Sequence, residues 1–389
     1  MGVAVEAPAP DDRCRLSRLP SPPGLTAAQL RRAPKVELHR HLDGSLRAQT
    51  VIDLARDARY AKLPESEAAA LARWFARASD RQSLPLYLEG FQHTIAVLQT
   101  EDALERAGFE ALEDFARDGG VYAELRFAPH FHTSGGLDQR AVMRAVIRGC
   151  EGAAREYGVG WGLIVCALRN EPPDRSFEQA ELALEFREQG CVGFDLAGEE
   201  DGFPAADHAR AFELARKSNF SVTIHAGESF GPQSIWQALH HCGAHRIGHG
   251  VRLVEDMTPA GDCGPLARYV LDKRVPLELC LSSNVQTGAV ANLGAHPFPL
   301  LLRRGFRVTL SSDNTLMSAT DASAEYALAQ REFGCTLDDL ERLAINAMKS
   351  AFAPWEQRVR HIYERIKPGY AALRDELGLP PRAPYGSRT

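Results

Sequence analysis

The sequence predicts an α/β fold, a (β/α)8 TIM barrel with extra helices inserted after the first strand. Eight short apolar segments alternate with longer stretches of helical periodicity along the chain. Strands without a polar face are typical of parallel sheets that helices cover on both sides. Eight such units within 389 residues fit a closed barrel better than an open sheet.

The predicted elements follow one another with one large interruption. The insertion 48–118 carries several helical patterns and is too long to be a bare loop. We expect residues 1–30 to form a disordered Pro-rich tail, residues 31–377 a single barrel domain, and residues 378–389 a loose C-terminal tail. The eight predicted strands are 35–42, 121–128, 160–168, 191–197, 220–226, 246–250, 275–282 and 306–312.

The composition argues against several classes of protein. Hydrophobic residues make up 44% and charged residues 25%, as in an ordinary globular enzyme. The net charge of −6 provides no basic excess for phosphate contacts, so we expect no nucleic-acid partner. No uninterrupted apolar stretch reaches the ~18 residues of a membrane span. The eight cysteines lack CxxC spacing and several lie in apolar runs, which favours buried free thiols and a cytoplasmic location.

The first candidate metal ligands lie at the end of the first predicted strand. Side chains alternate along a strand, so His39, His41 and Asp43 share one face. Imidazoles and a carboxylate that converge at the C-terminal end of a barrel strand indicate a metal site. The HxH pair is a weak signal by itself, and a surface pair or a hydrogen-bonded polar cluster remains an alternative.

His225 ends the fifth predicted strand, and Ala226 and Gly227 then turn the chain towards Glu228. Small residues at such a turn let a ligand approach the backbone closely, and Glu228 can reach back over the same site. A single histidine at a strand end is more often a hydrogen-bonded core residue. The small residues and the glutamate that follow favour the functional interpretation.

His249 lies between two glycines at the end of the sixth predicted strand. Turns rarely use histidine in place of Asn or Asp, so this imidazole favours acid–base chemistry over a plain turn. The neighbouring histidines lie on a helix and its exit loop, and we interpret them as surface residues: His240, His241 and His245.

Asp313 follows the eighth predicted strand and would complete a set of three histidines and one aspartate. An Asp at this position is also a common helix N-cap. The joint pattern predicts ligands at the ends of strands one, five and eight, with Glu228 and His249 outside the ligand set as acid and base. The seventh segment, LELCLSSN (277–284), offers no ligand, and its serines are at most pocket wall.

These motifs, in this order, resemble those of the adenosine deaminase family, within the amidohydrolase group of metal-dependent barrels. The resemblance extends over about residues 33–370. It rests on PKVELHRHLDGSLR (34–47), DLAGEE (195–200), HAGES (225–229), RIGHGVRL (246–253), LCLSSNVQTGA (279–289), SSDN (311–314) and INAMKSAF (345–352).

The resemblance implies a metal, an acid and a base. Glu228 would deliver a proton to purine N1, and His249 would orient and deprotonate the attacking water. One Zn²⁺ per chain would be held by His39, His41, His225 and Asp313.

The resemblance also implies substrate contacts. Gly198 would meet purine N3 through its backbone, and Asp43 would hold the ribose 5′-hydroxyl. An apolar lid would comprise Leu84, Tyr87, Leu88 and Phe91. The spacing of these four residues indicates one helix face, which an ordinary core-facing stripe would show equally.

Asn314 departs from the family pattern, in which a second aspartate is usual. Purine N7 is an acceptor, and the Asn amide can donate to it whereas an ionised Asp cannot, so the role can survive. Leu281 stands where Pro is frequent, and we expect little effect.

The implied function is zinc-dependent hydrolytic deamination of adenosine and 2′-deoxyadenosine to inosine and 2′-deoxyinosine plus ammonia, in purine salvage. The expected partner is then a small purine nucleoside, and we expect no membrane partner. The oligomeric state stays open. Adenine or aminodeoxyfutalosine as substrate, and a catalytically silent binding protein, are alternatives. Asp43 favours a free 5′-hydroxyl over a second carboxylate. A two-metal enzyme is disfavoured because the fourth strand lacks the lysine that would bridge two metals.

Overall fold

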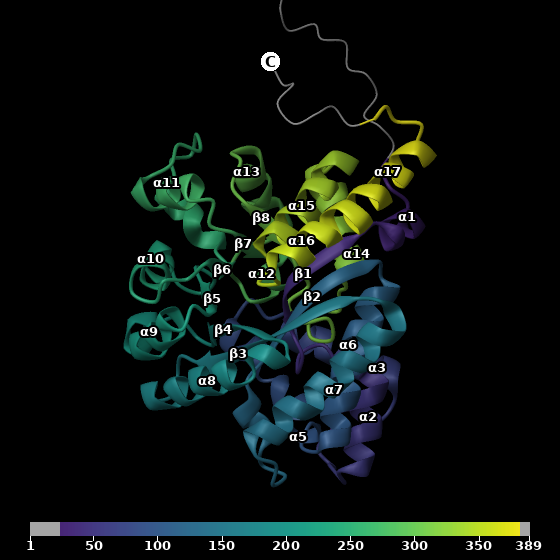
Figure 1. Ribbon diagram of the computed structural model, residues 1–389, viewed down its shortest axis with the longest axis vertical. Helices are drawn as coiled ribbons and strands as arrows, with labels where there is room; N and C mark the ends of the chain where they lie inside the picture. Colours follow the sequence, from purple (N-terminus) through teal and green to yellow (C-terminus); the bar gives the residue numbers. More distant parts are fainter. Residues whose placement is uncertain (1–23, 382–389) are drawn as a thin grey trace, which may run out of the picture.

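Eight parallel strands form the centre of the protein in this computed structural model, which describes residues 24–381 (Figure 1). Each strand pairs with the next in chain order, and a parallel bridge between Arg40 and Asp313 joins the end of the sheet to its beginning. The (β/α)8 barrel is therefore confirmed. The strands are β1 (Lys35–His41), β2 (Gly120–Phe127), β3 (Gly160–Leu168), β4 (Cys191–Ala197), β5 (Ser221–Ala226), β6 (Arg246–His249), β7 (Leu277–Leu279) and β8 (Val308–Leu310).

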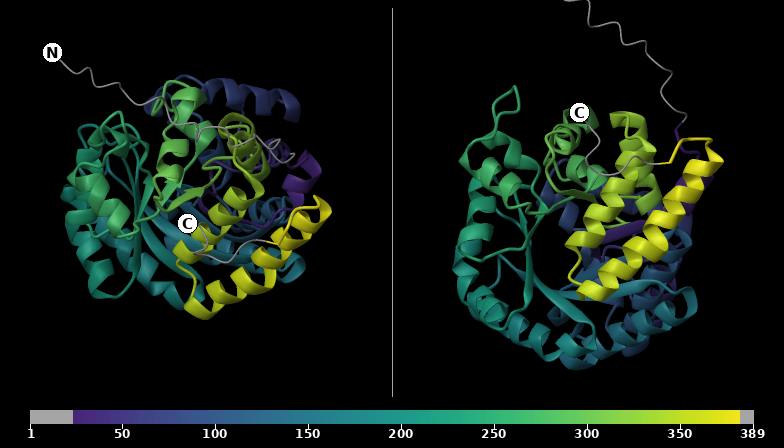
Figure 2. Two further views of the ribbon diagram at one scale, coloured as in Figure 1. Left: turned by 90° about the horizontal axis from the view of Figure 1, so that it is seen from above. Right: turned by 45° about the horizontal axis from the view of Figure 1, so that its top comes forward.

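Helices surround the strands, as both views in Figure 2 show. Local sequence sets their ends: the longest begins where the Asp138 side chain accepts a hydrogen bond from the Ala141 N–H, and it stops at Gly158 with φ of 65°. The helices after β2 are α7 (Gln139–Tyr157), α8 (Pro173–Glu185), α9 (Ala209–Lys217), α10 (Pro232–His240), α11 (Pro265–Asp272), α12 (Leu281–Gln286), α13 (Phe298–Arg303), α14 (Ala322–Phe333), α15 (Leu337–Ser350), α16 (Trp355–Arg360) and α17 (Lys367–Glu376).

The insertion predicted after β1 is helical, as expected. Glu67 begins one of its helices by accepting hydrogen bonds from the N–H groups of Ala69 and Ala70. The last helix of the insertion packs along α7. The helices of the insertion are α2 (Ala48–Asp57), α3 (Ala68–Ser79), α4 (Leu84–Leu88), α5 (Phe91–Val97) and α6 (Glu101–Arg117).

The ordered fold begins earlier than the sequence suggested. Helix α1 (Ala27–Arg32) begins inside the range 1–30 that we expected to be a disordered tail. Thr26 and Gln29 form a reciprocal capping box at its start, and Leu30 is buried. Gln29 also donates to Glu376 at 3.0 Å, so α1 lies beside α17 (Figure 1). The tail expectations for residues 1–23 and 382–389 lie outside the described residues.

The seventh strand is shorter than predicted because a helix replaces its end. β7 stops at Leu279, and α12 begins at Leu281. The Glu325 carboxylate of α14 accepts hydrogen bonds from the N–H groups of Leu281 at 2.8 Å and Ser282 at 3.3 Å. These donors of the first helical turn have no partner within the helix, so a buried carboxylate beside them favours the helix.

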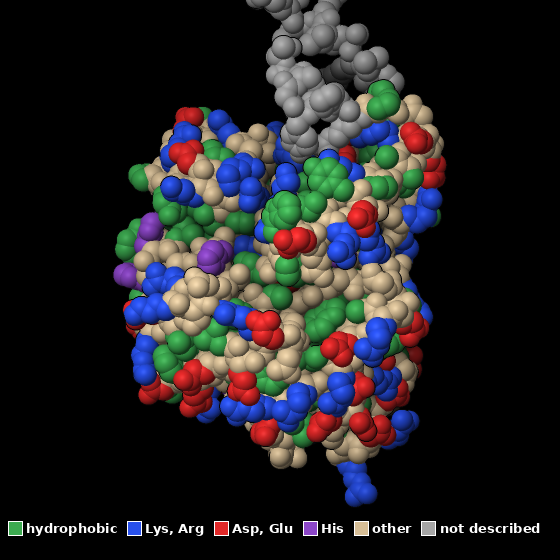
Figure 3. All heavy atoms as spheres, viewed as in Figure 1, with side chains coloured by type: hydrophobic (Ala, Val, Ile, Leu, Met, Phe, Trp, Pro, Cys, Tyr) green, Lys and Arg blue, Asp and Glu red, His purple; other side chains and the backbone are tan. Residues whose placement is uncertain are grey.

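The surface mixes both signs of charge. On the face shown in Figure 3, Lys and Arg side chains are interspersed with Asp and Glu, and histidines show at the edge next to α10. The three histidines assigned to the surface are exposed, as expected: His240, His241 and His245. Among residues 24–381, no helix combines the length and hydropathy needed to cross a membrane.

Candidate active site

His39, His41 and Asp313 meet at the seam where the barrel closes. The His41 N–H donates to the Asp313 carbonyl at 2.8 Å, and the Asp313 N–H donates to the His39 carbonyl at 3.0 Å. This pairing brings the Asp313 carboxylate beside both rings, with Oδ1 3.3 Å from each Nε2. Backbone hydrogen bonds of the barrel itself therefore assemble half of the predicted site.

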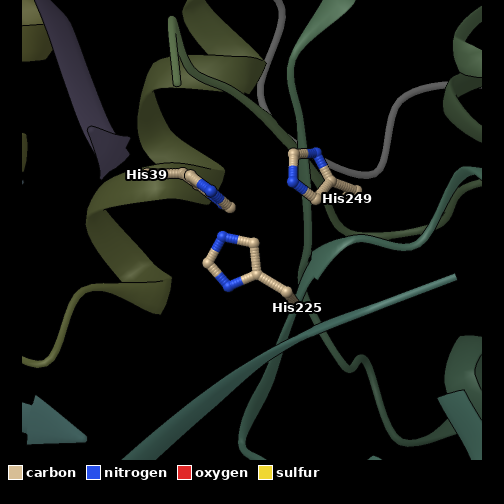
Figure 4. Close-up of side chains that lie close together, drawn as sticks. All are labelled: His39, His225 and His249. Atoms are coloured by element: carbon tan, nitrogen blue, oxygen red, sulfur yellow. The ribbon is translucent and has the colours of Figure 1, made fainter. Parts of the chain in front are cut away.

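The ends of β5 and β6 add two more imidazoles (Figure 4). The Nε2 atoms of His225 and His41 lie 3.1 Å apart. The ring centroid of His39 lies 4.5 Å from that of His225 and 4.6 Å from that of His249. Gly248 permits this crowding, because a Cβ atom there would lie only 3.1 Å from both His225 Cα and His39 Cε1.

Two of these residues have a strained backbone. His249 and Asp313 have left-handed conformations, with φ of 60° and 61°. Such conformations cost residues other than glycine on the order of 1–3 kcal/mol and persist only where the surroundings enforce them. Strain of this kind is typical of functional sites, and here it falls on two residues that the sequence singled out.

The cluster has the donor set of a metal site. The Nδ1 atoms of His39 and His225 lie 3.0 Å and 3.2 Å from carboxylate oxygens behind them. A ring that donates from Nδ1 keeps a lone pair on Nε2, and the His39 Nε2 is buried without a hydrogen-bond partner. Three imidazole nitrogens and one carboxylate oxygen are typical zinc donors. The residues present therefore fit a metal ion.

Alternative ligand sets fit less well. Two further sets of residues have ligand atoms within 4.8 Å of one another. One set is His249, Cys280 and Asp313, and the other is His39, His225 and His249. Burial raises the pKa of the Cys280 thiol well above its ordinary value, and only a thiolate is a good ligand. The Nδ1 of His249 lies 3.0 Å from the amide nitrogen of Asn284, which donates, so the ring hydrogen is on Nε2 and no lone pair is left there for a metal.

A buried arginine links the two carboxylates behind the imidazoles. Arg126 in β2 donates to Asp195 at 3.0 Å and to Glu278 at 2.8 Å, and all three side chains are fully buried. Burial opposes ionisation of Glu278, but Arg126 and Arg246 outweigh it and hold its pKa well below the ordinary value. The role of this group was not predicted from the sequence. Charged residues within apolar strands are the signal that could have found it, since a buried charge needs a partner.

Glu228 lies beside the cluster, next to His249. Its Oε2 is 3.4 Å from the His249 Nε2, and its Oε1 accepts a hydrogen bond from the Thr287 hydroxyl at 2.9 Å. Burial, followed by the charges of Asp313 and Glu200, raises the pKa of Glu228 well above its ordinary value. A carboxyl group that keeps its proton near neutral pH can act as an acid.

The loop that carries Glu228 is anchored by Glu200, which ends the motif DLAGEE. The Glu200 carboxylate accepts hydrogen bonds from three successive N–H groups, those of Gly227 at 2.8 Å, Glu228 at 2.8 Å and Ser229 at 2.9 Å. Gly227 has φ of 72°, which glycine adopts without strain. Of the two small residues predicted to turn the chain, Ala226 is the last residue of β5, and Gly227 makes the turn beside a buried carboxylate.

The segment 277–284 contributes more than the pocket wall that we expected. Ser283 is fully buried and donates to Asp313 Oδ2 at 2.6 Å. Asn284 contacts His249, and Glu278 contacts His39. The expectation was wrong because β7 and α12 place Glu278, Ser283 and Asn284 behind the site, where they contact three of its side chains.

A cavity of about 540 Å³ lies beside the cluster, a volume that suits a small organic ligand. The four lid residues do not share one helix, because α4 ends at Leu88 and Phe91 begins α5. All seven residues to which the resemblance assigned substrate contacts line the cavity: Asp43, Gly198, Asn314, Leu84, Tyr87, Leu88 and Phe91.

Asp43 and Asn314 present unpaired polar atoms at this cavity. The Oδ1 atom of each is buried without a hydrogen-bond partner, and burial raises the pKa of Asp43 to about 7. Asn314 packs against Gly44, where a Cβ atom would lie only 1.7 Å from Asn314 Oδ1. Buried polar atoms are nearly always paired, so the unpaired Asp43 Oδ1 indicates a polar ligand.

A (β/α)8 barrel that gathers three histidines and an aspartate at its strand ends defines the class of metal-dependent hydrolases. Within this class the chain matches the adenosine deaminase family over residues 34–368. The chain belongs to that family, and the resemblance seen in the motifs is confirmed. It is 49% identical over 370 residues to Adenosine deaminase 1 of Streptomyces coelicolor, covering 93% of this chain and 92% of that protein. It is 50% identical over 358 residues to the adenosine deaminase of Mycobacteroides abscessus, covering 90% and 98%.

Solved structures share the barrel. Arabidopsis ADAL complexed with IMP matches with a TM-score of 0.76 at 27% identity, covering 89% of this chain and 98% of that one. Adenine deaminase from Arthrobacter aurescens matches with a TM-score of 0.77 at 25% identity, covering 88% and 99%. An amidohydrolase from Burkholderia ambifaria with bound Zn matches with a TM-score of 0.79 at 24% identity, covering 90% and 94%, a likeness of fold.

Proposed function

We propose that this protein catalyses the hydrolytic deamination of adenosine and 2′-deoxyadenosine, which leaves inosine or 2′-deoxyinosine and releases ammonia. The observation that carries the proposal is the cluster of imidazoles and Asp313 beside a cavity of nucleoside size, with Glu228 and His249 next to it. Relatives at 49% and 50% identity bear the name adenosine deaminase, which supports this choice of substrate.

One Zn²⁺ per chain is the metal that we propose for the cluster. Bound zinc lowers the pKa of water to about 7 and so supplies hydroxide at neutral pH. The unpartnered Nε2 of His39 and the facing Nε2 atoms of His41 and His225 support the assignment. The ligands would be His39, His41, His225 and Asp313.

Glu228 would give its proton to purine N1 while the oxygen of the attacking water adds to C6. Its raised pKa supports this role as an acid. The proton that the water loses has two candidate acceptors beside the cluster, the His249 imidazole and the Asp313 carboxylate. The acceptor passes this proton to the amino group, which leaves C6 as ammonia, and the hydroxyl on C6 returns a proton to Glu228 as the C6 carbonyl forms. A well-placed acid or base typically contributes ~10²–10⁴ in rate.

The cavity supports a nucleoside in preference to a free base or a nucleotide. The unpaired Oδ1 of Asp43 would accept a hydrogen bond from the ribose 5′-hydroxyl, a group that adenine lacks. The Asn314 amide would donate to purine N7, and the Gly198 backbone would meet N3. The described residues that line the cavity include no Lys or Arg, while Asp43 and Glu199 are among them, so a 5′-phosphate would meet repulsion.

The described cysteines also bear on location. All seven are free, and six of them are buried. Unpaired thiols are typical of proteins in reducing compartments, which supports a cytoplasmic enzyme of purine salvage.

Steady-state turnover of five substrates tests the proposal: adenosine, 2′-deoxyadenosine, adenine, aminodeoxyfutalosine and AMP. Zinc-loaded protein should favour the two nucleosides, and a chelator should abolish their turnover. Faster turnover of adenine or aminodeoxyfutalosine would overturn the choice of substrate. Absence of turnover on every aminopurine by zinc-loaded protein would support a silent binding protein instead.

A further inference from the structure

A chain of buried hydrogen bonds runs towards His249 from the segment before α13. It begins where the Phe298 N–H donates to the Nδ1 of His296 at 3.1 Å, so this nitrogen is an acceptor. Burial lowers the pKa of His296 to about 3, which leaves the ring neutral near pH 7. A neutral ring whose Nδ1 accepts carries its hydrogen on Nε2.

The next member of the chain is Asn284 in α12. Its Oδ1 lies 3.3 Å from the His296 Nε2 and accepts a second hydrogen bond, from the Cys280 N–H at 3.2 Å. Two donors at one amide atom identify that atom as the oxygen. The amide nitrogen therefore faces His249, whose Nδ1 lies 3.0 Å away. His296, Asn284 and His249 are each at most 2% exposed, so bulk water does not compete for these bonds.

The consequence is a difference between His249 and the histidines beside it. His39 and His225 place Nδ1 against carboxylates, which accept, so their lone pairs lie on Nε2 and face the cluster. His249 places Nδ1 against an amide N–H, which donates, so its Nε2 carries a hydrogen. A metal ligand needs a lone pair, and a proton acceptor needs one as well. In the resting protein the Nε2 of His249 has no free lone pair, so it can neither bind a metal nor accept a proton.

We propose that Asn284 and His296 are positioning residues that hold His249 as a hydrogen-bond donor through Nε2–H. His249 donates to the attacking oxygen and keeps its proton. The water O–H bond breaks with transfer of the proton to the Asp313 carboxylate, and Glu228 supplies the separate proton to the purine. This role differs from the deprotonating role that the family resemblance implies for His249. The reaction step rests on the proposed function, whereas the tautomer is a property of the resting protein.

Nitrogen-15 NMR of zinc-loaded, histidine-labelled protein tests the tautomer without turnover. His249 should give a protonated, pyrrole-type signal for Nε2 and an unprotonated, pyridine-type signal for Nδ1, with His249→Gln used for assignment. A protonated Nδ1 on His249 would overturn the proposal even in a fully active enzyme. If the protein shows the expected tautomer but turns over no aminopurine, the positioning role of Asn284 and His296 stands. Only the proposed function is then contradicted.

Asn284→Asp tests the consequence for catalysis with an isosteric change. A carboxylate can only accept, so it should move the His249 hydrogen to Nδ1 and strip Nε2 of its donor. We expect the swapped NMR pattern, unchanged zinc content and kcat lower by ~10²–10⁴-fold, the range seen when a catalytic histidine takes the wrong tautomer. A retained or higher kcat with the swapped pattern would refute the donor role. A lower kcat without the swapped NMR pattern would refute the claim that Asn284 sets the His249 tautomer.

His296 provides a second test that keeps Asn284 in place. His296→Phe removes one donor to the amide oxygen and should give mixed His249 tautomers with kcat about 10-fold lower. His296→Gln keeps an N–H at that point and should restore the single tautomer and most of kcat. His245→Gln, at an exposed histidine outside the site, serves as the control and should match the wild type. Equal losses in the Phe and Gln variants would show that His296 does not act through its hydrogen bond.

Discussion

Replacing Glu278 by glutamine tests whether the charge behind His39 supports metal binding. The Glu278 carboxylate lies 3.0 Å from His39 Nδ1 and accepts from Arg126 at 2.8 Å. It also accepts from Arg246 at 2.5 Å and from Thr223 at 3.1 Å. Glutamine keeps the shape but brings one acceptor oxygen and an amide N–H₂ to a place where four donors converge. His39 therefore loses its charged partner, and with it part of the basicity of Nε2.

The size of each effect follows from these contacts. Loss of the partner behind a metal-ligating histidine typically lowers metal affinity 10–100-fold, which is about 1.4–2.8 kcal/mol. Breaking a buried ion pair costs about 3–5 kcal/mol of stability. Arg126 keeps Asp195, and Arg246 keeps Glu124 at 2.6 Å, so we expect the lower end, about 3 kcal/mol.

Two measurements on one matched pair of variants separate these effects. Competition with a fluorescent chelator gives the zinc affinity, and denaturant unfolding of the metal-free protein gives the stability. Glu124→Gln is the control, because Glu124 is equally buried and pairs with the same Arg246 but has no hydrogen bond to an imidazole. Glu278→Gln should weaken both quantities and Glu124→Gln the stability alone. Unchanged zinc affinity in Glu278→Gln, or equal losses in both variants, would refute the reasoning.

Glu228→Gln and His249→Ala should keep zinc in metal analysis and lose most activity, whereas His225→Ala should lose the zinc; equal zinc losses in all three would contradict this division of roles. Gly248→Ala should weaken zinc binding in chelator competition and lower the unfolding free energy by about 1–3 kcal/mol, because its Cβ would press on the histidines from 3.1 Å. Unchanged binding would count against that packing argument. Burial raises the pKa of Glu325 from 4.5 to about 7, so between these values the folded protein holds a proton that the unfolded chain has released. Stability should therefore fall as pH rises through this range, by up to about 3 kcal/mol, and Glu325→Gln should flatten the profile. Parallel profiles for the two proteins would exclude Glu325 as the cause.

The barrel and the ends of its strands could be predicted because the relevant signals are local. Apolar runs mark the strands, and His225 or His249 at the end of such a run is visible within a few residues of sequence. Parallel pairing then brings all strand ends to one side, so side chains from distant segments meet without any knowledge of contacts. The same local logic failed at Leu281, because the helix there depends on Glu325 from another helix.

The layer behind the imidazoles could not be predicted because it is defined by pairs. Glu278 and Asp195 each sit in an apolar strand, and nothing in either strand says which histidine it faces. That choice follows from Arg126, which holds both carboxylates at once. The role of Asn284 is equally invisible, since it depends on which of its amide atoms faces His249.

The seam between β1 and β8 also sets the order of events during synthesis. His39 is made early, but Asp313 leaves the ribosome only after most of the chain, and the two are joined by backbone hydrogen bonds. The four proposed ligands therefore do not come together until the last strand has docked on the first. We therefore expect the proposed metal to bind late in maturation, and the bound ion would link the two ends of the barrel. A nascent or truncated chain that ends before residue 313 would lack the Asp313 carboxylate and the metal link between the two ends of the barrel.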